Sequence, residues 1–132
     1  MIFGIGIDLV RISRMEAALE RHGRRFAERI LGEGELVRFD ASRRKAAFLA
    51  KHFAAKEALL KALGTGMRMG IQWEDMEVRN DDLGKPFVVC GGRVQTLFDE
   101  HGISQSFLSI SDEDEYAAAF VTLVRGGSRA ST

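Results

Sequence analysis

The sequence has 132 residues, which is long enough for one hydrophobic core and too short for two comfortable domains. Hydrophobic residues make up 45% and charged residues 29%, which excludes a disordered or fibrous chain, and the single cysteine, Cys90, excludes an internal disulfide framework. The formal net charge is zero, yet arginine and lysine crowd into the first half of the chain, which suggests an anionic partner or ligand.

The first predicted element is a strand over residues 2–10, in which apolar residues alternate with a face that holds Gly4, Gly6 and Asp8. The two glycines leave that face without side chains, which suits the close approach of another group. The segment lacks a basic start, carries Asp8 and is far too short to span a membrane. We therefore expect a cytoplasmic protein with no membrane-spanning segment.

Helices are predicted next. A capping-box pattern at Ser13 and Glu16 predicts a helix over residues 14–22, and shorter helical pieces follow as far as residue 39. The longest helix is predicted over residues 42–63 and is closed by Gly64. Apolar residues cover this helix on nearly all sides, so we expect it to be central, with the rest of the fold wrapped around it.

The second half of the chain predicts strands and one short helix. The strands are expected over residues 73–79, 87–90, 107–111 and 116–125, and the helix over residues 94–101. No repeat or linker interrupts the chain, so we expect an α+β fold in which an antiparallel sheet packs around one long helix. This single domain covers residues 1–125, and residues 126–132 form a flexible polar tail.

Two carboxylates stand out in this pattern. Glu57 lies in the apolar stripe of the long helix, one turn before Lys61, and an ionised group there is costly unless it is paired or binds a metal. For Glu57, the sequence leaves two interpretations: an ion pair with Lys61 or a metal site. For Asp8, one interpretation is that its side chain caps the turn after the strand. Neither a P-loop nor a dinucleotide-binding glycine fingerprint is present.

Two segments carry a resemblance to a known family. The sequences GIGIDLVRISRME near the start and FLAKHFAAKEALLKALGTG in the middle resemble the two signatures of holo-acyl-carrier-protein synthases. The segments GIQWEDMEVRNDDLGKPFVV and SISDEDEYAAAFVTLV are similar to later parts of the same family, so the resemblance covers almost the whole chain. It implies an enzyme of fatty acid biosynthesis that transfers the 4'-phosphopantetheine arm of coenzyme A to acyl carrier protein.

The resemblance implies catalytic roles for Asp8, Glu57 and Lys61. Asp8 and Glu57 would bind a Mg²⁺ ion that also holds the pyrophosphate of coenzyme A, and Lys61 would reach the same phosphates. The serine hydroxyl of the carrier protein would attack the β-phosphate and release adenosine 3',5'-bisphosphate. Either Glu57 or a metal-bound water would remove the serine proton.

The resemblance also implies a set of coenzyme A contacts. Small residues in the loop after the long helix would let its backbone approach the ligand. Many relatives have arginine where this chain has His52 and histidine where it has Asp112, so positive charge near the nucleotide phosphates is reduced here. The implied contacts are Lys56, Lys61, Gly64, Thr65, Gly66, His52, Pro86 and Asp112.

The implied partners are coenzyme A and apo acyl carrier protein, with no nucleic acid. Arg14, Arg21 and Arg24 lie where the family docks the acidic helix of the carrier protein. The family also forms homotrimers with coenzyme A between neighbouring subunits. Two other functions stay open: a transferase that serves polyketide or peptide synthases, and a non-catalytic module that binds an acidic protein or nucleic acid through its arginines.

Overall fold

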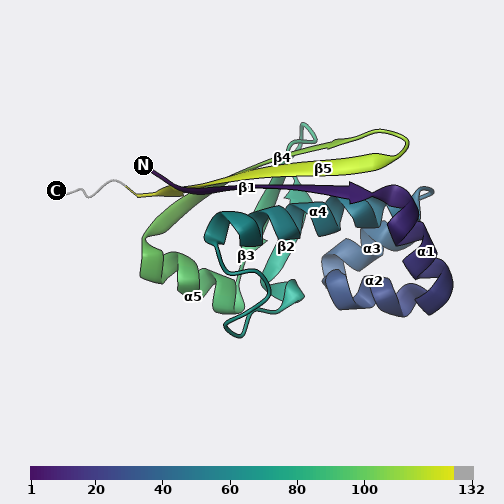
Figure 1. The fold of residues 1–132 in the computed structure, drawn as a ribbon, viewed down its shortest axis with the longest axis horizontal. Coiled ribbons are helices and arrows are strands. Elements are labelled where there is room, and N and C mark those ends of the chain that lie inside the picture. Colours follow the sequence, from purple (N-terminus) through teal and green to yellow (C-terminus); the bar gives the residue numbers. More distant parts are fainter. Residues whose placement is uncertain (127–132) are drawn as a thin grey trace.

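A computed structural model describes residues 1–126, so the tail predicted over residues 126–132 lies outside the described residues except for Gly126. One long helix, α4 (Lys45–Leu63), packs against one face of a three-stranded antiparallel sheet (Figure 1). The strands are, in spatial order, β1 (Ile2–Arg11), β5 (Tyr116–Arg125) and β4 (Ile103–Asp112). The predicted α+β architecture is confirmed.

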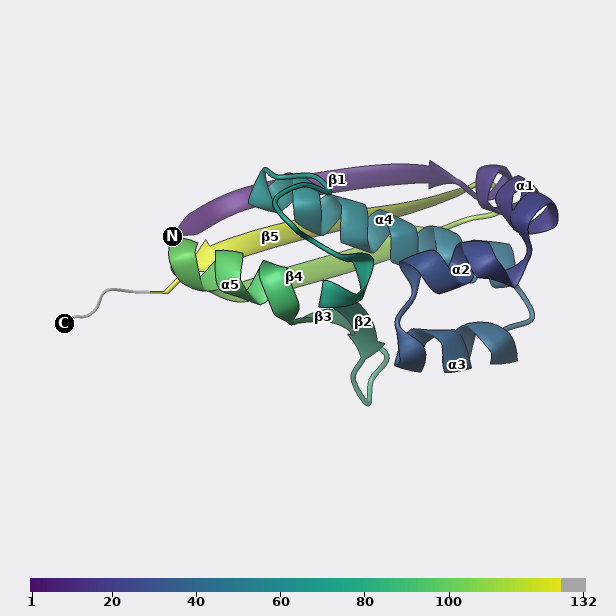
Figure 2. The ribbon, with the colours of Figure 1, turned by 90° about the horizontal axis from the view of Figure 1, so that it is seen from below.

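The remaining elements surround α4 (Figures 1 and 2). At its N-terminal end lie α1 (Ile12–His22), α2 (Arg24–Ile30) and α3 (Glu33–Ala41), and near its other end lies α5 (Gly92–His101). A 3₁₀ turn, η1 (Trp73–Asp75), leads into a hairpin of β2 (Met76–Asn80) and β3 (Pro86–Cys90). None of the helices in residues 1–126 combines the length and apolar character that crossing a membrane requires.

Backbone meets backbone where β1 crosses α4. A Cβ atom on Gly4 would lie 2.0 Å from the carbonyl oxygen of Ala62, and one on Gly6 would lie 2.0 Å from that of Ala58. Gly4 and Gly6 are separated by two strand residues, a rise of about 6.8 Å, and Ala58 and Ala62 by four helix residues, a rise of about 6.0 Å. Because these two rises are similar, the two glycines meet successive turns of α4. The side-chain-free face predicted from the sequence is therefore filled by α4. We call this contact the glycine crossing, and Asp8 is the next residue on the same face of β1.

The long helix ends where the sequence predicts but begins three residues later. Gly64 closes α4 in the left-handed conformation, with a φ of 88°. The predicted start at Ser42 is wrong, because α4 begins at Lys45. The Ser42 hydroxyl instead accepts a hydrogen bond from the backbone N–H of Arg44, at 3.1 Å, and so stabilises the turn before the helix.

Three other predicted boundaries change for local reasons. The capping box predicted for α1 is wrong, since no side chain caps this helix. The strand predicted over residues 73–79 begins only at Met76, because residues 73–75 form η1. The strand predicted over residues 107–111 begins earlier, at Ile103, because the left-handed Gly102 ends α5 and turns the chain directly into β4.

The face of the sheet that points away from α4 is apolar and exposed. On β1, the side chains of Ile5, Ile7 and Leu9 are 59%, 61% and 63% exposed. On β4 and β5, Phe107 and Phe120 are 50% and 43% exposed, and Phe120 lies opposite Ile7 in the strand register. We call these five residues the outer face. Large exposed apolar patches of this kind mark interaction surfaces.

Candidate active site

Charged side chains meet at the point where β1 crosses α4. The ammonium of Lys61 donates to the Asp8 carboxylate at 2.9 Å and to the carbonyl oxygen of Ile7 at 3.0 Å. Glu57 precedes Lys61 by one turn and lies within about 40° of it around the helix axis. Lys61 pairs with Asp8 across two elements, so the local ion pair considered for Glu57 is not formed. Asp8 does not cap α1 either.

Asp8 and Glu57, which we call the carboxylate pair, repel each other. Burial raises the pKa of Glu57 above its ordinary value of 4.5, and the negative charge of Asp8 raises this pKa further. The positive charges of Lys61 and Arg14 act in the opposite direction. When one of two neighbouring carboxylates is pushed toward its neutral form, a nearby cation stabilises both groups as anions.

The carboxylate pair fits Mg²⁺, an ion that one or two carboxylates bind while water and phosphate complete its shell. Within residues 1–126, no group of three or more His, Cys, Asp or Glu side chains is arranged to hold a metal ion. A cation held by Asp8 and Glu57 would therefore have no third His, Cys, Asp or Glu ligand from the described residues. Such a site leaves coordination positions for the phosphates of a substrate.

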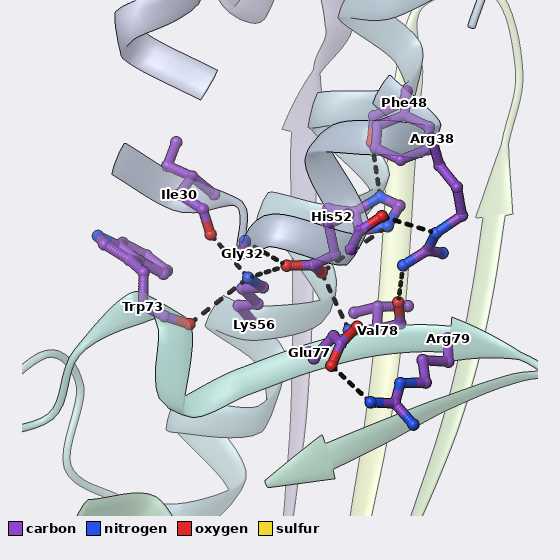
Figure 3. Close-up of polar contacts among 12 residues, drawn as sticks. Ile30, Gly32, Arg38, Phe48, His52, Lys56, Trp73, Glu77, Val78 and Arg79 are labelled. Atoms are coloured by element: carbon purple, nitrogen blue, oxygen red, sulfur yellow. Dashed lines mark hydrogen bonds and ion pairs between the residues drawn. The ribbon is translucent and has the colours of Figure 1, made fainter. Parts of the chain in front are cut away.

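Lys56, the neighbour of Glu57, points into the protein interior (Figure 3). Its side chain is fully buried, and its ammonium donates to the Glu35 carboxylate at 2.7 Å and to the carbonyl oxygen of Ile30 at 2.7 Å. The phosphate contact predicted for Lys56 is wrong, because a buried ammonium with these partners cannot reach a ligand at the surface. The helical period explains the difference from Glu57, since adjacent residues point about 100° apart.

Three of the predicted nucleotide contacts do come together. His52, Pro86 and Asp112 line one cavity of about 250 Å³, which lies between α4, the β2–β3 hairpin and β4. Lys51 lines the same cavity, and its ammonium lies 3.9 Å from the Asp112 carboxylate. Lys51 was not predicted from the sequence, although it lies inside the segment FLAKHF. We call this space the basic-acidic cavity after Lys51 and Asp112.

The imidazole of His52 carries no positive charge into this cavity. Its ring stacks on Phe48 with centroids 4.1 Å apart, and Nδ1 lies 2.9 Å from the Phe48 carbonyl oxygen. Since a carbonyl can only accept, Nδ1 is the donor, and Nε2 has no hydrogen-bond partner in residues 1–126. Burial lowers the pKa of His52 to about 4, against the weaker opposing effect of Glu35. The ring is therefore neutral near pH 7.

The loop predicted to lie along the ligand follows Lys61 at the end of α4. Gly64 and Gly66 have left-handed φ angles of 88° and 62°, which favour glycine. Between them, Thr65 is mostly buried, its hydroxyl donates to the Gly66 carbonyl at 2.9 Å, and its carbonyl accepts from Arg68 at 2.7 Å. These contacts give the loop a defined shape at the C-terminal end of α4.

Two of the predicted docking arginines line a second cavity. Arg14 and Arg21 border a space of about 430 Å³ whose walls include Ile30, Phe53 and Trp73. We call it the docking cavity. Its apolar walls come from α1, α2, α4 and η1, and the sequence analysis missed them because they join only in the folded chain.

Arg24 lies outside the docking cavity. Its guanidinium donates to both carboxylate oxygens of Asp40, at 2.9 Å and 2.7 Å, and also pairs with Glu28. These two anions compensate the charge of Arg24, so it has less charge to offer a partner than Arg14 and Arg21 have.

The predicted metal ligands and the predicted contacts in the basic-acidic cavity lie on two sides of α4. Asp8 lies on the edge strand β1, whereas Asp112 lies on the opposite edge strand, β4. On the helix itself, His52 and Glu57 are separated by about 140° around the axis. A single chain therefore places the carboxylate pair and the basic-acidic cavity on different surfaces.

Comparison with known proteins gives consistent matches over nearly the whole chain. Residues 4–121 match the 4'-phosphopantetheinyl transferase superfamily. The holo-[acyl-carrier-protein] synthase of Halorhodospira halophila is 52% identical, and the alignment covers 96% of this chain and 100% of that protein.

Solved structures agree with these sequence matches. The crystal structure of holo-[acyl-carrier-protein] synthase from Neisseria meningitidis has a TM-score of 0.89 at 40% identity, and it covers 95% of this chain and 100% of that one. The enzyme from Bacillus anthracis, in complex with CoA (3',5'-ADP), has a TM-score of 0.81 at 39% identity, with 96% and 99% covered.

The fold and these matches define a 4'-phosphopantetheinyl transferase. The chain belongs to the holo-[acyl-carrier-protein] synthase family within that superfamily. The family resemblance read from the sequence segments is confirmed.

Proposed function

We propose that this chain transfers the 4'-phosphopantetheine group of coenzyme A to a serine of apo acyl carrier protein, in support of fatty acid biosynthesis. The serine hydroxyl loses its proton to Glu57 or to a water at the site, and its oxygen forms a bond to the β-phosphorus of coenzyme A. The bond from that phosphorus to the bridging oxygen breaks, and adenosine 3',5'-bisphosphate leaves. The observation that carries the proposal is the meeting of Asp8, Glu57 and Lys61 at the glycine crossing.

Each of these residues has a role that its position supports. Asp8 and Glu57 would hold Mg²⁺, which when bound supplies positive charge to the substrate phosphates. Lys61 is half-exposed, so its ammonium can contact the phosphates while it orients the Asp8 carboxylate. The negative charge that develops on the phosphoryl oxygens would then be stabilised by the ammonium of Lys61 and by the bound cation. Phosphoryl transfers gain much of their rate from such stabilisation by groups that are already positioned.

A mass measurement tests this function directly. Incubation with apo acyl carrier protein, coenzyme A and Mg²⁺ should add one phosphopantetheine group to the carrier, and adding excess EDTA should stop the reaction because the carboxylate pair loses its cation. Restoring Mg²⁺ should restore it. A carrier whose mass never changes would disprove the transferase activity, and a transfer that proceeds in EDTA would disprove the metal requirement.

Cell fractionation tests the cytoplasmic location that we propose for this reaction.

We propose that the carrier protein docks on the docking cavity through Arg14 and Arg21. Arginines beside apolar walls suit an amphipathic helix that is acidic on one side, because its charges meet the guanidinium groups while its apolar residues enter the cavity. Arg24 contributes less in this arrangement, since Asp40 and Glu28 already compensate its charge.

Docking of this kind depends on charge. Raising the salt concentration should raise the KM for the carrier protein and hardly affect the KM for coenzyme A, because exposed ion pairs are screened. Arg14→Glu and Arg21→Glu should each raise the carrier KM by about ten-fold, and Arg24→Gln by less than about two-fold. Steady-state kinetics with each substrate varied in turn checks this. If the carrier KM is the same in all three variants, the docking surface is elsewhere.

We also propose a homotrimer with coenzyme A bound between neighbouring subunits, as the family resemblance implies. The outer face supports assembly, because five large apolar residues would otherwise stay in water. The division of the predicted contacts supports a shared site, because the β1 edge of one subunit and the β4 edge of a neighbour could together enclose one ligand.

A further inference from the structure

Lys56 brings three segments together around one buried ammonium (Figure 3). The Nζ atom donates to Oε1 of Glu35 at 2.7 Å, to the carbonyl oxygen of Ile30 at 2.7 Å and to that of Trp73 at 3.5 Å. Both Lys56 and Glu35 are completely buried. Because a buried charge without its partner is strongly destabilising, each member of this pair depends on the other.

Glu35 extends this network to further backbone groups. Its Oε1 also accepts from the N–H of Gly32 at 2.9 Å, and its Oε2 accepts from the N–H of Val78 at 3.0 Å. The ion pair thus joins α4 to the end of α2, the first turn of α3, η1 and β2. Most of the partners are backbone atoms, so the network fixes the position of whole segments relative to α4.

Two of these segments form walls of the docking cavity. Ile30 and Trp73 both line it, and the Trp73 ring packs on Phe53 of α4 with centroids 5.5 Å apart. The carboxylate pair is held differently, because the glycine crossing joins β1 to α4 without any contribution from Lys56. Loss of the Lys56 network should therefore affect the docking cavity more than the metal site.

We propose that Lys56 is a positioning residue for the carrier protein. Through its pair with Glu35, it sets the walls of the docking cavity relative to Glu57, the adjacent residue on α4, and it touches neither substrate. This inference rests on the proposed function, since it concerns the docking of acyl carrier protein.

The double variant Lys56→Met/Glu35→Gln tests the proposal. It removes both buried charges at once, replaces lysine by an unbranched side chain one atom shorter, and leaves an amide oxygen that can still accept from a backbone N–H. The expected result is a carrier KM raised by about ten-fold, with the Mg²⁺ concentration for half-maximal rate changed by less than about two-fold. The KM for coenzyme A should change much less than the carrier KM, although Glu35 also contacts Val78 and lies near His52, which line the basic-acidic cavity. The matched control is Lys45→Met, which replaces an exposed lysine on the same helix. This variant should behave as the parent protein.

A second variant covers the case in which the double variant does not fold. Lys56→Arg keeps the charge beside Glu35, but its planar guanidinium cannot reproduce the donation to the carbonyls of Ile30 and Trp73. We expect the carrier KM to rise by about three-fold and the KM for coenzyme A to stay unchanged.

Trp73 provides a readout that does not need turnover, because it is the only tryptophan in the chain. Its emission should shift to longer wavelength in the double variant as its ring gains water, and titration of apo carrier protein followed by this signal gives the carrier affinity directly. If the parent binds the carrier but does not modify it, the proposed reaction fails, and the affinity ratio between parent and variant still judges the inference.

Two results would overturn the role of Lys56. An unchanged carrier affinity in folded Lys56→Met/Glu35→Gln and in Lys56→Arg would show that the ion pair is dispensable for docking. A rise confined to the KM for coenzyme A would instead return Lys56 to a phosphate contact. A rise confined to the carrier, together with the shift in Trp73 emission, supports positioning.

Discussion

Replacing Asp8 by asparagine or Glu57 by glutamine is expected to reduce turnover by about two to four orders of magnitude. Both changes keep the shape of the side chain and remove a charge that would hold Mg²⁺. Because both carboxylates would hold the same ion in the proposed site, the double variant should be scarcely worse than either single variant. Turnover and Mg²⁺ titration of the three variants measure both effects.

Although Glu57→Gln should reduce turnover, it should increase the stability of the folded protein. The pKa of Glu57 is raised in the folded protein, so above its ordinary value of 4.5 the folded state holds a proton that the unfolded chain has released. The unfolding free energy therefore decreases as the pH rises from about 4.5 through the raised pKa of Glu57. Glutamine does not titrate, so Glu57→Gln should not show this decrease. In metal-free buffer, Glu57→Gln should melt at a higher temperature than the parent at about pH 7 and at a similar temperature near pH 4.

Asp8→Asn differs because it also breaks the pair with Lys61. That lysine is half-exposed, so its pair contributes less than about 1 kcal/mol, and the melting temperature should change little. Asp82→Asn, in the exposed turn between β2 and β3, controls for the loss of a carboxylate elsewhere. Reduced stability with intact turnover in Glu57→Gln would count against the magnesium site.

The faces on which Asp8 and Glu57 lie could be anticipated from the sequence because those signals are local, whereas only the family resemblance implied that the two carboxylates meet. Alternation on β1 puts Gly4, Gly6 and Asp8 on one face, and the helical period puts Glu57 beside Lys61. The boundaries of β5 and the end of α4 were predicted for the same reason, since an acidic turn and Gly64 mark them within a few residues. Patterns of this length depend on propensity and periodicity, which the sequence displays directly.

The partners of the lysines could not be anticipated, because they are distant in the chain. Lys61 lies four residues from Glu57, yet it pairs with Asp8, 53 residues away. Lys56 has acceptors 26 and 21 residues earlier, at Ile30 and Glu35. Periodicity predicts the face of a helix or strand on which a side chain lies, but it does not predict which element packs against that face. The erroneous phosphate contact at Lys56 arose from this gap.

Placing a charge at the centre of the outer face is expected to separate the subunits. Phe120 lies on the middle strand opposite Ile7, and it is 43% exposed in the protomer, so Phe120→Lys can be solvated in a folded monomer. In an assembled interface the same lysine would be buried without a partner, which costs several kcal/mol per site. Sedimentation equilibrium should therefore give a trimer for the parent and a monomer for Phe120→Lys.

If the proposed shared site exists, activity should disappear with the assembly, because the carboxylate pair on the β1 edge of one subunit would lose Asp112 on the β4 edge of its neighbour. We expect turnover to fall by about 100-fold with a melting temperature that reports a folded chain. Val37→Lys, at an exposed apolar residue of α3, is the matched control and should stay trimeric and active. A Phe120→Lys protein that still sediments as a trimer would disprove the outer face as the interface. A folded monomer with full activity would disprove the shared site, because it would mean that one subunit binds coenzyme A without a neighbour.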